Sequence, residues 1–275
     1  MALQTQIWLA DIVEPLFADN SFASRSINHS GFVNHNTVHV PNAGAAPSVV
    51  KNRSQLPATI GQRTDIDLSY QMAEYTTDPI FIPNVDETEL SYDKRASVLY
   101  QVREALATTV HGDVLKQWIT GGNTHSAGNN NAVPSDIKQI VLEIKEKFDN
   151  ADLPQNGRCL LLTPAFYNAL LKQLTAFEGQ SFLASANAQR GTLGNLFGFD
   201  IYMRSQIMTD DSGQNDKVYH MVGWQEGCVS RALGQTELFT DERNPAWYGD
   251  ILSALVRAGG SRIRNDKNGL EAYYL

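Results

Sequence analysis

The sequence has few cysteines, few basic residues and no long apolar run. Its 275 residues include two cysteines, and 22 basic against 30 acidic side chains give a formal net charge of −8. No run of about 18 apolar residues is present, so no transmembrane helix is expected. The start, MALQTQIWLADIVEPLF, has no basic segment and no long apolar core, which argues against a secretory signal. The acidic balance argues against a dedicated nucleic-acid reader, because such proteins normally carry a basic stripe.

Sequence signatures of common active sites are also missing. There is no Gly-x-Ser-x-Gly, His-Glu-x-x-His, paired Cys-x-x-Cys or Walker sequence. Cys159 and Cys228 lie in apolar stretches, and we expect buried thiols in a reducing compartment rather than a disulfide or a nucleophile. A chain of this length without such a constellation is more often structural than catalytic.

Three weaker polar patterns favour loops and turns over binding sites. The histidines lie in an extended context without an acidic or Cys partner, the carboxylates lack calcium-loop spacing, and the glycines precede a strand rather than a helix. The residues concerned are His29, His35 and His39; Asp210, Asp211 and Asp216; and Gly191, Gly194 and Gly198.

Residues 91–119 form the longest segment without proline and predict one long helix. Ser91 can cap its start, and Gly121 and Gly122 can end it. Its main apolar row steps by four residues every time, whereas an α-helix repeats about every 3.6 residues, so the row turns gradually around the helix. We therefore expect a strut that contacts different neighbours along its length. The row is Val98, Val102, Leu106, Val110, Val114 and Trp118.

The segments before this helix have too little apolar sequence for a core of their own. Residues 1–31 include a short amphipathic pattern around Trp8 and Phe17 that predicts a helix. Residues 32–85 read as two extended stretches around a Pro- and Asn-rich loop, with alternation over residues 66–72 that is typical of a one-faced strand. We expect a partner to cover this protruding arm.

Two further blocks follow the long helix. Residues 133–224 predict an α/β sandwich of helix, strand, helix and two strands, in which Thr163 caps a helix that begins at Pro164. Residues 225–275 are rich in strand candidates and contain no helix that could cover them, so the long helix is expected to do so. The expected fold class is α+β.

Two motifs and the order of the parts resemble one known family. The stretch RCLLLTPAFYNALLKQL, followed by GTLGNLFGFDIYMRSQI, and the closing RAGGSRIRNDKNGLEAYYL look like segments of the major capsid proteins of tailed phages with the Hong Kong 97-type fold. The resemblance covers nearly the whole chain, and its motifs are structural. It implies an N-terminal arm (1–31), an extended β-loop or E-loop (32–85), a peripheral domain (86–132 and 225–275) with a spine helix at 91–119, and an axial domain (133–224).

The resemblance implies a structural protein without catalysis, metal or cofactor. Copies of such a chain form hexamers and pentamers of an icosahedral virion shell around double-stranded DNA, and the E-loop of one subunit lies over its neighbour. Assembly is expected in the host bacterial cytoplasm, without a membrane and with only non-specific DNA contacts. Because the chain begins at Met1 directly with the arm, a separate scaffolding protein is expected, beside a portal and an optional decoration protein.

Nine residues are candidates for assembly contacts. Lys51 lies in the E-loop, where some family members cross-link a Lys to an Asn, although no motif here marks it. The three C-terminal arginines fit a solvated sheet face, ion pairs between subunits, or a face that touches nucleic acid. The candidates are Trp8, Phe17, Lys51, Arg53, Arg63, Tyr70, Arg257, Arg262 and Arg264.

Three other functions stay open. An encapsulin-like nanocompartment that stores a cargo enzyme shares the fold, and the sequence hardly separates it from a phage shell. A minor virion protein, such as a decoration or tail component, fits the long arm and long helix less well. A soluble α/β enzyme with its catalytic domain in residues 133–224 lacks any catalytic constellation.

Overall fold

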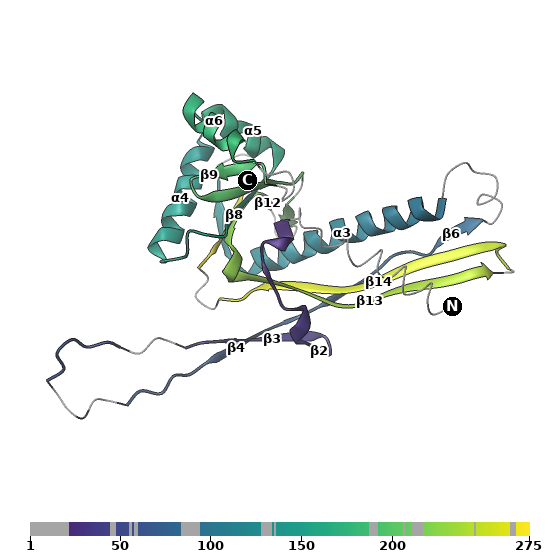
Figure 1. Ribbon diagram of the computed structural model, residues 1–275, viewed down its shortest axis with the longest axis horizontal. Helices are drawn as coiled ribbons and strands as arrows, with labels where there is room; N and C mark the ends of the chain where they lie inside the picture. The colour runs from purple at the N-terminus through teal and green to yellow at the C-terminus, as the bar shows by residue number, and fades with distance from the viewer. Residues whose placement is uncertain are drawn as a thin grey trace.

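The described part of the molecule contains two large sheets, a small projecting sheet, one long helix and three shorter helices (Figure 1). The computed structural model describes residues 22–44, 48–54, 57, 60–83, 94–127, 134, 136–186, 192–205, 207–210, 217–244, 246–264 and 268–275. Helices and strands are mixed along the chain, which confirms the expected α+β class. The helix predicted around Trp8 and Phe17 lies outside the described residues.

Helix α3 (Lys94–Gly121) lies along the five-stranded sheet and ends against the seven-stranded sheet (Figure 1). The apolar row predicted from the sequence is buried from Val102 to Trp118. Because the row turns around the helix, its middle packs on β14, while the Trp118 ring at its end lies 5.9 Å from the Trp224 ring of the seven-stranded sheet. The start predicted at Ser91 lies outside the described residues. No described helix is long and apolar enough to cross a membrane.

The five-stranded sheet has the order β1-β13-β14-β5, and β6 also pairs with β14. Every second residue of β14 is buried under α3, because the side chains of a strand point alternately to its two faces. These residues are Leu252, Ala254, Val256 and Ala258, so the long helix covers the C-terminal strands as expected. The strands are β1 (Ile27–Asn28), β5 (Ala73–Thr76), β6 (Ile80–Pro83), β13 (Val229–Asn244) and β14 (Gly249–Arg262).

The seven-stranded sheet has the order β7-β15-β12-β8-β10-β9, with β11 also on β12. One face packs on helices α4 (Ile137–Asn150), α5 (Pro164–Gln173) and α6 (Ala176–Ala184), and the other face joins the core under the end of α3. The strands are β7 (Asn123–Ser126), β8 (Arg158–Leu162), β9 (Gly194–Leu196), β10 (Phe199–Met203), β11 (Met208–Asp210), β12 (Lys217–Gln225) and β15 (Leu270–Tyr274). The turn η4 (Glu226–Cys228) leads from β12 to β13.

Two of the three helices on this sheet were predicted from the sequence, and the third was not. Helix α4 is the first helix predicted in this block and buries one apolar face, and α5 begins at Pro164 as expected. The Thr163 hydroxyl does not cap α5; its Oγ1 lies 3.1 Å from Nδ1 of His220. Helix α6 was not predicted, although its Thr175 and Glu178 form a capping box, and that spacing is a readable signal for a helix start.

The last strand, β15, corrects the predicted grouping of residues 225–275. It lies between β7 and β12 in the seven-stranded sheet, where its Leu270 and Ala272 join the core under the end of the long helix. Apolar and polar residues alternate along this strand, yet both of its faces are covered, and even the Glu271 carboxylate is buried. His125 and Lys147 contact this carboxylate at 2.5 Å and 3.1 Å, which makes its burial tolerable. Strand β7, which contributes His125, lies outside the two blocks that the sequence predicted after the long helix.

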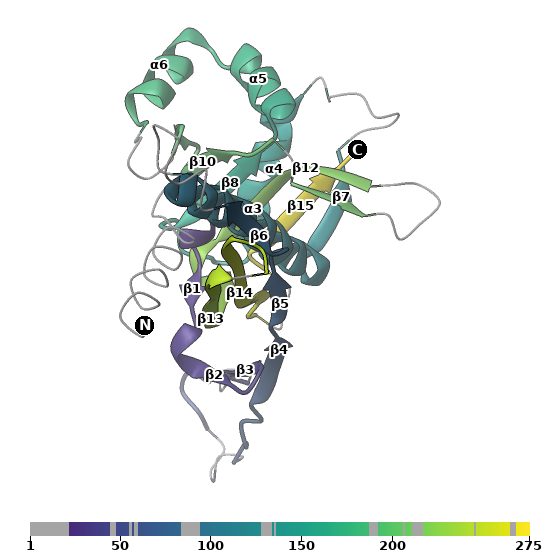
Figure 2. The same ribbon diagram turned by 90° about the vertical axis from the view of Figure 1, so that its right-hand side faces the viewer.

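The small sheet forms the base of a projecting hairpin. It consists of β2 (Val33–Asn34), β3 (Thr37–Asn42) and β4 (Ile66–Gln71), after the short turns η1 (Phe22–Ser24) and η2 (Ser30–Phe32). Figure 2 shows this sheet on the side of the five-stranded sheet away from α3. The projecting part is shorter than the predicted residues 32–85, because β5 and β6 return to pair with β14.

Candidate assembly surfaces

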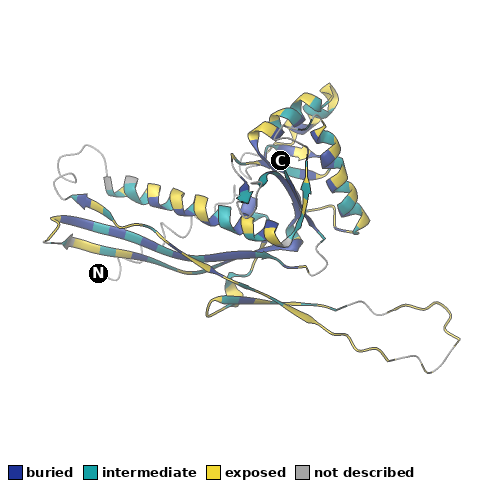
Figure 3. Ribbon diagram, turned by 180° about the vertical axis from the view of Figure 1, so that it is seen from behind, coloured by how far each residue is buried: buried dark blue, intermediate teal, exposed yellow. Residues whose placement is uncertain are grey.

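The end of the β3–β4 hairpin exposes apolar and basic side chains beyond the rest of the molecule (Figure 3). The side chains of Val49 and Ile60 are 95% and 97% exposed, and Lys51 and Arg53 are exposed beside them. We call residues 48–54 the loop tip. Apolar area gains about 25 cal/mol per Å² when it leaves water, so a surface that covers the loop tip is favoured.

The base of the hairpin is anchored on the five-stranded sheet. Val38 and Met72 are buried against Ala232 of β13. The hydroxyls of Tyr70 and Ser230 lie 3.3 Å apart, and burial raises the pKa of the Tyr70 hydroxyl. Tyr70, a predicted assembly residue, therefore holds the hairpin within its own subunit, and the anchored base aims the loop tip in a fixed direction.

The Asp65 carboxylate receives contacts from both sides of the hairpin. Nε of Arg63 lies 2.7 Å from Oδ1 of Asp65, and the Gly44 N–H donates to the same oxygen at 2.9 Å. The hydrogen bond from Arg63 lowers the pKa of Asp65. These groups are exposed to water, so their attraction is screened and shapes the loop more than it stabilises the chain. Arg63 is therefore engaged within its own chain.

The three C-terminal arginines lie apart rather than in one cluster. Arg257 donates two hydrogen bonds, of 3.0 Å and 2.8 Å, to Oε2 of Glu74 across the β14–β5 pair. Arg262 is half-buried at the end of β14, and Arg264 is exposed just beyond it. The Arg257 pair joins two strands of one subunit.

The face of the five-stranded sheet away from α3 carries exposed aromatic residues that the sequence did not indicate. Phe239 and Trp247 are 50% and 62% exposed, and the Trp247 ring lies 6.3 Å from the Phe81 ring. Glu237 and Asp241 lie two residues before and after Phe239, so the strand period places them on the same face. We call this surface the open face. The alternation of residues along β13 indicates that the strand has two different faces. Only the pairing of β13 with β14 shows which of these faces α3 leaves uncovered.

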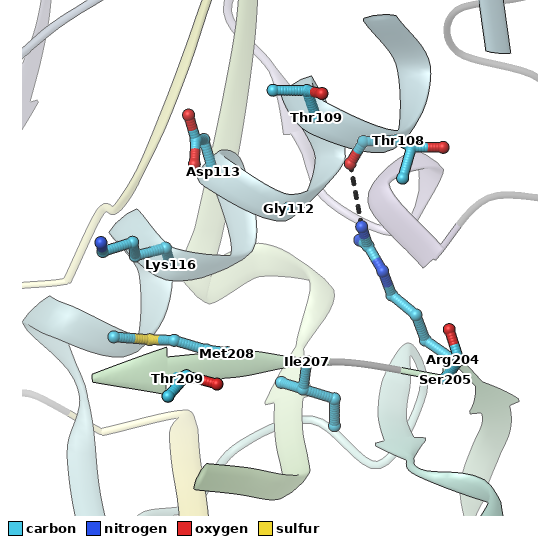
Figure 4. A pocket seen from close by; sticks show the side chains of 10 residues that line it. All are labelled: Thr108, Thr109, Gly112, Asp113, Lys116, Arg204, Ser205, Ile207, Met208 and Thr209. Carbon is cyan, nitrogen blue, oxygen red and sulfur yellow. Dashed lines mark hydrogen bonds between the residues drawn. The ribbon is translucent and has the colours of Figure 1, made fainter. Parts of the chain in front are cut away.

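A cavity of about 340 Å³ lies between α3 and the seven-stranded sheet (Figure 4). Arg204 crosses one end of it, where its Nη2 donates to the Thr108 carbonyl at 2.9 Å and its guanidinium lies 5.5 Å from the centre of the Phe22 ring. Burial lowers the pKa of Arg204. Gly112 makes room for this side chain, because a Cβ there would lie 3.3 Å from Nη2. These contacts give Arg204 a structural role in holding β10 against α3.

The two cysteines are buried in the described structure and form no disulfide, as the sequence predicted. Burial raises the pKa of the Cys159 thiol, so a thiolate nucleophile is disfavoured there. Among the predicted assembly residues, Lys51 and Arg53 lie at the loop tip, while Trp8 and Phe17 lie outside the described residues.

The chain matches no protein-family model and no curated protein. Its fold matches solved structures. A chain of Mycobacterium phage Che8 is 17% identical, with a TM-score of 0.67 over 92% of this chain and 90% of that chain. A chain in the capsid structure of the cyanophage P-SCSP1u is 14% identical, with a TM-score of 0.69 over 91% of this chain and 86% of that chain.

A virus-like particle from Pyrococcus furiosus is 9% identical, with a TM-score of 0.62 over 98% of this chain and 99% of that chain. At such identities, similarity shows a common fold and leaves the function to be argued from the surfaces. The matches cover 91–98% of this chain, so the similarity extends over most of its length. The chain therefore has the Hong Kong 97-type capsid fold of tailed-phage major capsid proteins, which its sequence motifs resemble.

Proposed function

We propose that this chain is a major capsid protein whose copies form the hexamers and pentamers of an icosahedral shell around double-stranded DNA. The observation that carries the proposal is the loop tip, which presents exposed apolar side chains beyond the rest of the molecule on a capsid fold. A lone monomer gains nothing from such an arm, whereas a ring of copies can cover each tip. The role is structural and requires no catalysis.

In this proposal the parts have the following roles. Residues 1–31 are the N-terminal arm, the hairpin within residues 32–85 is the E-loop, and α3 is the spine helix. The five-stranded sheet is the core of the peripheral domain, and the seven-stranded sheet, with β7 and β15 added to residues 133–224, is the axial domain.

The open face is the surface we propose for the neighbour's loop tip. The hairpin base and the open face lie on the same side of the five-stranded sheet, away from α3. The loop tip carries Lys51 and Arg53 beside apolar Val49, and the open face carries Glu237 and Asp241 on either side of Phe239. The basic and apolar loop tip is therefore complementary to the acidic and apolar open face. This complementarity favours one relative position of neighbouring subunits.

Partners and location follow as parts of the same proposal. A shell of this kind is a virion capsid assembled in the host bacterial cytoplasm, with a separate scaffolding protein, a portal and an optional decoration protein. The net charge of −8 suits a shell that touches its packaged DNA without specific binding.

The test replaces the hairpin end and leaves its base intact. Asn42 pairs with Ile66, so an Asn-Gly turn in place of residues 43–65 closes the two strands in a short hairpin. We expect the variant to fold with unchanged circular dichroism and thermal unfolding, because the removed residues contribute to neither large core. Electron microscopy, with and without the scaffolding protein, should show particles for the parent chain and none for the variant.

A matched control shortens another hairpin. Asp210 pairs with Lys217 across β11 and β12, so residues 211–216 can be replaced by Asn-Gly in the same way. This control should assemble as the parent does. Normal particles from the 43–65 variant would contradict the role of the loop. A parent chain that stays monomeric at high concentration and with scaffold would contradict the capsid function itself.

An encapsulin-like nanocompartment is the second candidate. It is favoured by the match to the Pyrococcus furiosus virus-like particle, which extends over 98% of this chain. The contents of particles purified from the native source separate the two. Nuclease-protected double-stranded DNA supports a phage capsid, and an enclosed enzyme without DNA supports a nanocompartment.

A further inference from the structure

Residues 22–28 lie where α3 and the two large sheets meet. Phe22 is only 7% exposed and Ala23 is fully buried. The Phe22 ring meets three rings edge-on at centroid distances of 6.0–6.2 Å. Two of these rings, His111 and Trp118, belong to α3, and the third, Trp224, belongs to β12. Phe22 therefore contacts both the long helix and the seven-stranded sheet.

Arg25 ties the same segment to the seven-stranded sheet. Its guanidinium pairs with Asp200 of β10, its Nε donates to the Tyr202 hydroxyl at 3.0 Å, and Nη1 lies 3.4 Å from Oε1 of Glu226. The Trp224 indole N–H donates to the Arg25 carbonyl at 2.8 Å. Arg25 thus contacts two strands of this sheet and the turn that follows it.

The next residues belong to the other sheet. Ile27 and Asn28 form β1, which pairs in parallel with Ser230 and Arg231 of β13. The His29 N–H donates to the Arg231 carbonyl at 2.8 Å, and the Arg231 guanidinium donates back to the Ala23 carbonyl. Within seven residues the chain is therefore fastened first to one large sheet and then to the other.

Three short segments of the chain also connect the two large sheets directly. Each of the three contains a glycine: Gly122 between α3 and β7, Gly227 between β12 and β13, and Gly269 before β15. Gly269 has a φ of +88°, which suits glycine. Hinges are typically a few residues at the ends of elements, which describes these three positions.

We propose that residues 22–28 form a strap that fixes the angle between the two large sheets, and that release of Arg25 lets the sheets rotate about the three glycine-containing connections. The strap is part of a single subunit, so the inference does not depend on assembly.

Arg25→Gln tests the strap, and Arg257→Gln is the matched control. Both remove an arginine whose carboxylate pairs are partly exposed, but the Arg257 pair lies within the five-stranded sheet alone. Spin labels on Lys172→Cys of α5 and Asp241→Cys of β13 report the distance between the sheets. Cys159 and Cys228 are buried, so labelling is selective for the two exposed sites. Dilution with excess unlabelled chain keeps the measured distances within one subunit.

We expect one narrow distance for the labelled parent and the Arg257→Gln chain, and a second, shifted distance for Arg25→Gln. A single narrow distance in Arg25→Gln would overturn the strap, and so would equal broadening in both variants. If Arg25→Gln does not fold, the labelled parent is measured between about 0.1 M and about 1 M NaCl, where the Debye length falls from about 10 Å to about 3 Å. Salt should then produce the second distance, and its absence at high salt would overturn the proposal.

Discussion

At the scale of single residues, close packing decides which side chains the junction tolerates. Trp118 is fully buried, and its indole N–H donates to the Ser230 carbonyl at 2.8 Å. Gly260 of β14 lies against this pair, where a Cβ would be 2.8 Å from the Ser230 oxygen and 2.9 Å from Trp118 Nε1. The glycine is thus required by the approach of its neighbours and not by its backbone angles.

Gly260→Ala should therefore lower the free energy of unfolding by about 1–3 kcal/mol, the usual cost of overpacking. Gly179 in α6 has open space within 4 Å of the place that a methyl group would take, so Gly179→Ala should raise it by about 1 kcal/mol through helix propensity. Urea unfolding followed by circular dichroism measures both. Equal effects of the two substitutions would show that packing at Gly260 is not tight.

The capping box of α6 gives a pH-dependent contribution. Hydrogen bonds from Lys138, and then from Thr175, lower the pKa of Glu178 from 4.5 to about 2. A carboxylate with a lowered folded-state pKa stabilises the fold above its unfolded pKa, and this contribution disappears as the pH falls from 4.5 to about 2. Glu178→Gln should lower the melting temperature at pH 7, with a difference that shrinks steadily below pH 4.5. A constant difference from pH 7 to pH 3 would contradict this assignment.

At the scale of elements, α3 shows how far periodicity predicts structure. A row of residues spaced by four predicted both a long helix and its contact with more than one neighbour, and the burial from Val102 to Trp118 agrees. Periodicity could not assign β15, because a strand covered on both faces and a strand covered on one face can share the same alternation. The burial of Glu271 depends on His125 and Lys147, which are distant in sequence.

Leu106→Ala in the middle of α3 should cost about 2–5 kcal/mol, because the lost side chain leaves a cavity over the five-stranded sheet. Thr109→Ala, on the exposed side of the same helix, should change the free energy of unfolding by less than about 0.5 kcal/mol. Chemical denaturation of both variants measures the contrast. Similar values would place the buried face of α3 elsewhere.

At the scale of the whole molecule, the proposed assembly depends on exposed surfaces rather than on the buried cores. The sequence indicated that residues 32–85 need a covering partner and supplied Lys51 and Arg53, which the structure places at the loop tip. The sequence alone could not predict the open face, because the exposure of Phe239 depends on strand pairing and on the side of the sheet that α3 covers. Tyr70 and Arg257, two further candidates, make hydrogen bonds inside their own subunit, and their part in assembly stays a prediction.

Charge reversal tests whether the loop tip and the open face meet. Lys51→Glu with Arg53→Glu should abolish particles, because four acidic groups then face one another across the contact. Glu237→Lys with Asp241→Lys, added to the same chain, should restore them. Light scattering and electron microscopy of the three chains follow the outcome. Loss without restoration would mean that the loop tip meets a different surface.

The position of β15 also sets the order in which the molecule can be completed during synthesis. This strand comes after every other described strand in the chain, yet it lies inside the seven-stranded sheet, between β12 and β7. Until it has left the ribosome, both of its neighbours have an unpaired edge and the core beneath Trp224 lacks Leu270 and Ala272. The exposed hairpin is translated long before that moment. The exposed hairpin of a nascent chain is therefore available for contacts early, whereas the seven-stranded sheet is incomplete until β15 has been inserted.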